Sequence, residues 1–61
     1  MKIKAVINID GNEEWQNVPC VIIAAKGWCC FCLLNNGKVA EVGIEHLTII
    51  DKEYLDLFKE N

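Results

Sequence analysis

The feature that most constrains the fold is a hairpin signal, the segment Asn35-Asn36-Gly37, placed between residues 28–34 and 38–42. Asn and Gly tolerate the backbone angles that a tight hairpin turn requires. Residues 28–34, before the turn, are almost all apolar, and residues 38–42, after it, form a second, shorter segment that is typical of a strand. The pattern predicts two neighbouring antiparallel strands.

Other segments also indicate strands. Apolar and polar residues alternate over 3–9, which is typical of a strand with one wet face. Residues 18–25 are apolar almost throughout and predict a buried or strongly bent strand, with Pro19 at its beginning because proline cannot donate to a central ladder. Lys26-Gly27 predicts a tight turn.

The end of the chain completes the predicted architecture. Residues 43–46 are typical of one 3₁₀ turn, and 47–50 of a last short strand. Asp51 is expected to cap a helix over 51–61. This helix has an apolar stripe that either packs on the sheet or docks a partner; the stripe comprises Tyr54, Leu55, Leu57 and Phe58. With 61 residues there is room for one domain. We expect an all-β, five-stranded barrel over 1–50 with a short C-terminal α-helix packed on it.

The stretch GWCCFCLLNNGKVAEVGIEHLTII, residues 27–50, is similar to the second half of Tudor-type modules of the SH3-like barrel superfamily. Those modules have an apolar strand there, then a Gly turn, a short charged strand and a loop ending in Leu. The resemblance extends over residues 3–50 as a pattern of turns and apolar positions. It implies an SH3-like barrel with a 3₁₀ turn before the last strand.

Some Tudor-type modules bind methylated lysine or arginine in an aromatic cage through cation–π attraction. The corresponding positions here lie near Ile9, Leu33 and Asn36, and none of these residues is aromatic. Only Trp15 places an aromatic ring near a cage position. The resemblance therefore implies the fold for this chain but not the binding of methylated lysine or arginine.

Charge argues against a nucleic-acid partner. The net charge is −3 and the chain contains no Arg, whereas nucleic-acid affinity comes mostly from cations that neutralise phosphates. A nucleic-acid-binding barrel remains an alternative function that would have to use Lys2, Lys4 and Trp28. No apolar run is long enough to cross a membrane and no export signal is evident, so we expect no membrane partner and a cytoplasmic location.

Four cysteines suggest a different chemistry. Cys29 and Cys32 form a C-x-x-C pair, with Cys30 between them and Cys20 upstream. A zinc knuckle uses this spacing in a tight turn. In a strand, however, Cys30 and Cys32 lie on one face and Cys29 on the other. We therefore expect reduced, buried structural thiols and no metal, with a zinc or redox protein as a further alternative.

A catalytic site is not expected. The chain has no Ser, and no pattern brings its one histidine, His46, near a cysteine that it could activate. In a 3₁₀ turn, His46 is expected to be a solvated or capping residue. We predict that the chain is not an enzyme and needs no cofactor.

A tryptophan in a polar loop is the best candidate for a binding residue. Trp15 follows Glu13 and Glu14, and a large ring is costly to leave in water. It is expected either to anchor a partner, with the two glutamates selecting a basic one, or to fold back and close the barrel. Trp28 is expected in the core or at the barrel rim. We predict a small protein-interaction module whose partner is another protein or a second copy. A role as an accessory or inhibitory protein, of the kind that phages and mobile elements encode, is consistent with the size.

Overall fold

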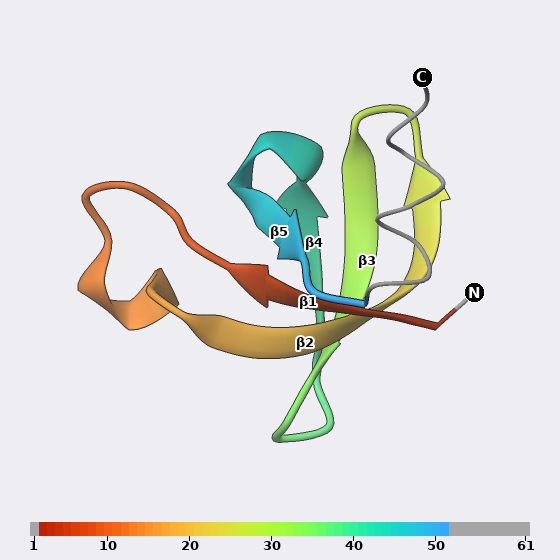
Figure 1. Cartoon of the computed structure of the whole chain (residues 1–61), viewed down its shortest axis with the longest axis horizontal. Coiled ribbons are helices and arrows are strands. Elements are labelled where there is room, and N and C mark those ends of the chain that lie inside the picture. The colour runs from red at the N-terminus through yellow and green to blue at the C-terminus, as the bar shows by residue number, and fades with distance from the viewer. Residues whose placement is uncertain (1, 52–61) are drawn as a thin grey trace.

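The computed structural model describes residues 2–51 as a single antiparallel sheet of five strands in the order β4-β3-β2-β1-β5 (Figure 1). Short 3₁₀ turns, η1 and η2, precede β2 and β5. The elements are β1 (Ile3–Ile7), η1 (Glu13–Trp15), β2 (Val18–Lys26), β3 (Cys29–Leu34), β4 (Val39–Gly43), η2 (Ile44–His46) and β5 (Leu47–Ile49). The all-β class, the five strands and the turn before the last strand are confirmed.

Strand β2 is the longest strand and pairs with two neighbouring strands. Residues 18–22 pair with β1, and residues 20–26 pair with β3. The register with β3 shifts between Ile22 and Ala24, so the strand carries a bulge where the sheet bends. The bend gives the sheet an inner face.

Pro19 lies one residue inside β2, opposite Val6 of β1. Hydrogen bonds from β1 to the β5 side leave from even-numbered residues: Asn8 donates to His46, and Lys4 accepts from Ile50. The odd-numbered residues of β1 therefore bond to β2, and the Pro19 nitrogen points toward the β3 side. Pairing with β3 begins only at Cys20, so the sheet loses no hydrogen bond because Pro19 lacks an N–H.

The predicted hairpin is present at residues 34–38. The N–H of Leu34 donates to the carbonyl of Lys38 (2.8 Å), and the N–H of Gly37 donates to the carbonyl of Leu34 (3.0 Å). Gly37 has φ of +86°, the left-handed conformation that this three-residue loop needs at its last position. Glycine is suited to this place because a Cβ would be strained there.

The core lies on the inner face of the bent sheet. Alternation along β1 places its odd-numbered residues inward and leaves Lys4 exposed, as predicted. No polar or charged residue is buried within residues 2–51. The core consists of Ile3, Ala5, Ile7, Cys20, Ile22, Cys30, Cys32 and Val42.

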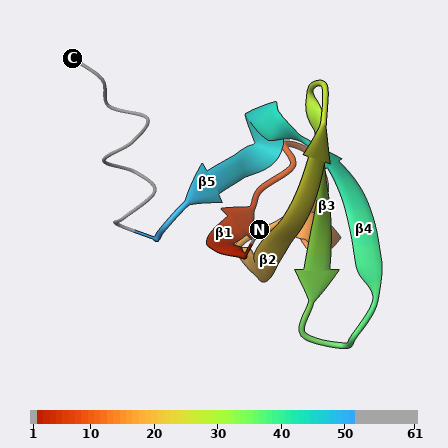
Figure 2. The same cartoon turned by 90° about the vertical axis from the view of Figure 1, so that its right-hand side faces the viewer.

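The prediction of a closed barrel is wrong, because the sheet is open. Within the described range, β4 pairs only with β3, and β5 pairs only with β1. Strand β5 has just three residues, and no ladder connects it to β4, which lies at the opposite edge in Figure 2. The bend in β2 curves the sheet without closing it.

Residues 2–51 contain no α-helix. The helix expected over 51–61 lies outside the described residues except for Asp51, which precedes its predicted body. Over the same described range, no helix has the length and apolar character needed to cross a membrane.

Candidate functional site

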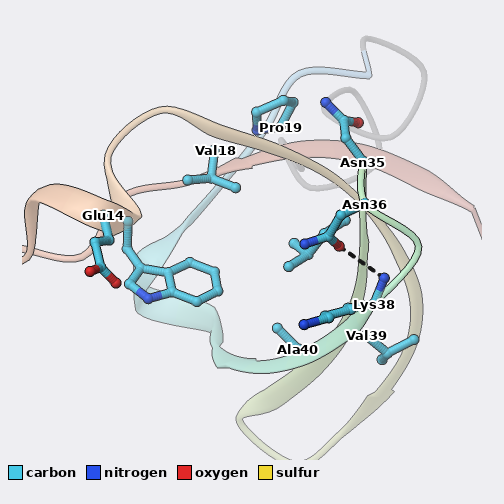
Figure 3. A pocket seen from close by; sticks show the side chains of 10 residues that line it. Glu14, Val18, Pro19, Asn35, Asn36, Lys38, Val39 and Ala40 are labelled. Carbon is cyan, nitrogen blue, oxygen red and sulfur yellow. Dashed lines mark hydrogen bonds between the residues drawn. The ribbon is translucent and has the colours of Figure 1, made fainter.

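An open, mainly apolar pocket lies at the end of the inner face, between η1 and the turn that joins β3 to β4 (Figure 3). Its volume is about 540 Å³, within the range usual for ligand sites. Loop, strand and turn residues contribute to its walls. The lining residues are Glu14, Trp15, Val18, Pro19, Leu34, Asn35, Asn36, Lys38, Val39 and Ala40.

Local hydrogen bonds hold the loop that carries Trp15. The Asn12 side chain caps η1 by accepting from the N–H of Glu14 (3.1 Å). The N–H of Ile9 donates to the carbonyl of Trp15 (2.8 Å), and the Gln16 side chain donates to the carbonyl of Ile9 (2.6 Å). The loop is thus tied across its base, which fixes where the indole lies.

The same loop contains one residue in the left-handed region, Asn17, with φ of +54°. Asparagine adopts this conformation more readily than most residues. Its N–H donates to the side-chain oxygen of Asn8 (2.8 Å), which closes the loop immediately before β2. The side chains of Asn8, Asn12 and Gln16 and the backbone of the loop therefore supply the bonds that hold the apolar ring of Trp15 in place.

Trp15 lies between the core and the pocket. Its side chain is half-buried and packs against the core, and it also lines the pocket. Glu14 lines the pocket as well and is exposed. Glu13 is exposed in η1 but is not part of the lining. Of the three predicted site residues, the structure therefore brings two together at the pocket.

The opposite wall comes from residues that the sequence analysis did not select. Val18, Leu34 and Ala40 are half-buried and continue the inward-facing positions of β2, β3 and β4. Each lies two residues from a buried core residue on its own strand, namely Cys20, Cys32 and Val42. Extending the two-residue period beyond the core would have identified all three.

Charge at the pocket is sparse and balanced. Among the lining residues, Glu14 is the only acid and Lys38 the only base. The side-chain oxygen of Asn36 accepts from the backbone N–H of Lys38 (2.9 Å), which orients the turn (Figure 3). The lining therefore suits an apolar group flanked by polar or charged ones.

The cysteines lie as the strand prediction requires. Cys30 and Cys32 are buried on the inner face, and Cys29 is half-buried on the other. All four thiols are free. Within residues 2–51, no three His, Cys, Asp or Glu side chains converge in a way that could hold a metal ion.

Burial also suppresses the reactivity of the inner thiols. Desolvation, and to a lesser extent the neighbouring Cys20 and Cys30, together raise the pKa of Cys32 to about 12. Burial likewise raises the pKa values of Cys20 and Cys30. These thiols stay protonated near neutral pH, whereas thiolates are the nucleophiles and metal ligands.

Trp28 is not in the core. Its side chain is 80% exposed, because Gly27 and Trp28 form the turn beyond the last β2–β3 pair, Lys26 with Cys29. The expectation of a core position for Trp28 is therefore wrong. Its carbonyl accepts from the N–H of Ile44 (2.8 Å), which ties the turn to the start of η2.

His46 lies in η2, the predicted 3₁₀ turn, and is half-exposed. Its Nε2 atom is 3.5 Å from a carboxylate oxygen of Glu45, so the pair forms an ion pair only when the ring is protonated. Neither residue lines the pocket.

A comparison of the chain with known protein families, curated proteins and solved structures gives no match.

Proposed function

We propose that the protein is a small, non-catalytic protein-interaction module and that the pocket beside Trp15 is its recognition site. The observation that carries this proposal is a half-buried tryptophan that forms one wall of an open, mainly apolar pocket. Aromatic residues in such positions are typical anchors of protein interfaces. An apolar side chain of a partner entering the pocket would gain about 1.5–3 kcal/mol from burial.

Charge and topology support this reading. The chain has a net charge of −3, and the exposed Glu13 and Glu14 stand in the loop beside the pocket, which favours a partner with basic residues. The strand order and the 3₁₀ turn before β5 support an SH3-like plan in open form. We place the protein in the cytoplasm, where free thiols remain reduced, and in an accessory or inhibitory role toward a larger protein.

Quantitative affinity capture from the native host tests the proposal. The immobilised wild-type chain is compared with Trp15→Ala and with Ala40→Leu, which fills the pocket without removing the indole. Trp28→Ala is the matched control, because it removes an exposed tryptophan outside the pocket. We expect proteins retained by the wild type and the control to be lost from both pocket variants.

Far-UV circular dichroism of each variant establishes that it is folded before capture. Equal recovery of every protein by wild type and by a folded Ala40→Leu variant would contradict the proposal. That outcome does not depend on Trp15→Ala retaining its stability.

A further inference from the structure

Strand β4 has one unpaired edge. The ladder with β3 is bracketed by two bonds, from the N–H of Leu34 to the carbonyl of Lys38 and from the N–H of Ile44 to the carbonyl of Trp28. Bonded pairs recur every second residue, so the residues of β4 that bond to β3 are the even-numbered ones. Val39 and Glu41 therefore direct their N–H and C=O groups away from β3.

No other strand within residues 2–51 meets these groups, and β4 forms the free margin of the sheet in Figure 2. The side chains of both residues are exposed as well, Val39 at 54%. An exposed strand edge of this kind is a template for pairing with another extended segment.

The free edge is continuous with the pocket. Val39 and Ala40, the first residues of β4, both line it. Ala40 is on the inner face with buried Val42, whereas Glu41 is on the outer face. A segment paired with β4 would thus present alternate side chains to the pocket and to Glu41.

We propose that a basic, extended peptide segment of a partner adds to β4 as an antiparallel strand. Its residue opposite Ala40 is apolar and enters the pocket beside Trp15, and its residue opposite Glu41 is Lys or Arg. Main-chain bonds to Val39 and Glu41 supply the register. This inference rests on the proposed function, because it uses the same pocket.

Charge favours such a peptide over a second copy of the chain. A symmetric antiparallel pair of β4 strands centred on Glu41, the middle residue of the strand, would place Glu41 directly opposite Glu41. Like charges directly opposite each other destabilise a strand pair. A Lys or Arg at that position instead forms a favourable cross-strand pair, and the overall charge of −3 attracts it.

The probe is the synthetic peptide acetyl-Thr-Lys-Leu-Val-Thr-amide, in which Lys, Leu and Val would face Glu41, Ala40 and Val39. It is titrated to millimolar concentration into the ¹⁵N-labelled full chain. We expect the amide signals of Val39 and Glu41 to shift and exchange more slowly with solvent. Those of Ala40 and Val42 already bond to β3 and should change less.

Backbone methylation of the peptide gives the decisive control. The amides of its Lys and Val would donate to β4, whereas the amide of its Leu would point away. N-methylation at Lys or at Val should weaken binding by about tenfold, the value of one or two lost hydrogen bonds. N-methylation at Leu should leave affinity within about threefold of the unmodified peptide.

A charge exchange tests the pairing with Glu41. Glu41→Lys should lose affinity for the Lys peptide and gain it for the peptide with Glu in that place. Asp10→Lys changes the net charge equally from an exposed position outside the pocket lining, so it should produce no such reversal.

Three outcomes would overturn the inference. These are peptide binding that shifts pocket signals but not the Val39 and Glu41 amides, equal effects of methylation at all three positions, and absence of any shift at millimolar peptide. A free chain that is already dimeric, with both amides protected, would assign the edge to a second copy. The affinity-capture comparison decides the proposed function independently of all these results.

Discussion

The core and the pocket are built from the same strands by the same alternation, yet they differ in what covers them. In the middle of the sheet, Ala5 and Cys32 are completely buried, because strands on both sides complete their surroundings. At the pocket end, Val18, Leu34 and Ala40 also face inward but are only half-buried, because the ladder ends there and a loop supplies the cover. Inward-facing positions line the pocket where strand pairing ends.

A matched pair of enlarged alanines should show this difference most strongly. Ala5→Leu forces three extra carbons into a filled core and should lower the free energy of unfolding by about 3 kcal/mol. Ala40→Leu extends into open space and should change it by about 0.5 kcal/mol or less. Urea unfolding followed by circular dichroism measures both. Equal losses would mean that the pocket is packed like the core.

The two tryptophans provide the next largest contrast. Trp15→Ala removes a ring that packs on the core and should cost about 2 kcal/mol, less than for a fully buried ring. Trp28→Ala removes an exposed ring and should cost about 0.5 kcal/mol or less. The same unfolding experiment applies. A larger cost at Trp28 would show that its turn has a packing role that its exposure does not indicate.

Alkaline pH should weaken the core. The pKa of Cys32 is raised from 9.0 to about 12 in the folded chain, so the folded state holds this proton more tightly than the unfolded state. The contribution of this thiol to stability is therefore fully present below pH 9 and falls as pH rises from 9 toward 12. The expected slope is about 1 kcal/mol per pH unit for this thiol. Unfolding midpoints across this range measure the slope, and Cys32→Ala should reduce it, leaving the part that comes from the raised pKa values of Cys20 and Cys30. A flat wild-type profile would contradict the burial argument.

The smallest effect is expected at the outward-facing thiol. Cys29→Ser should change stability by about 0.5 kcal/mol or less, since Cys29 is half-buried on the outer face. In the native wild type, a thiol reagent should react first at Cys29, with the three buried cysteines following more slowly. Mass spectrometry of the labelled peptides identifies the order. Early labelling of Cys30 or Cys32 would show that the inner face opens readily.

Much of the sheet could be predicted from local sequence. The turn residues Asn35-Asn36-Gly37 and Gly27 mark the β3–β4 and β2–β3 hairpins, and alternation assigns Cys30 and Cys32 to the inner face. Closure could not be predicted in this way, because it depends on long-range pairing of β4 with β5 and on the length of β5.

The candidate site was predictable only in part. A tryptophan within a polar loop drew attention to Trp15, whereas the opposing wall depends on where each ladder ends. Trp28 was misplaced because the turn consists of Gly27 and Trp28 instead of Lys26 and Gly27, and this shift by one residue places the ring beyond the ladder.

The position of Pro19 has a consequence for how the pocket can be approached. The pocket is bordered by two stretches of strand margin, one on β2 at Pro19 and one on β4 at Val39. The β2 stretch lacks an N–H donor at Pro19, so an extended peptide cannot form a regular ladder of main-chain hydrogen bonds there. The β4 stretch offers both the N–H and the C=O of Val39. Because Pro19 lacks an N–H, only the β4 edge of the pocket offers both main-chain donors and acceptors to an extended peptide.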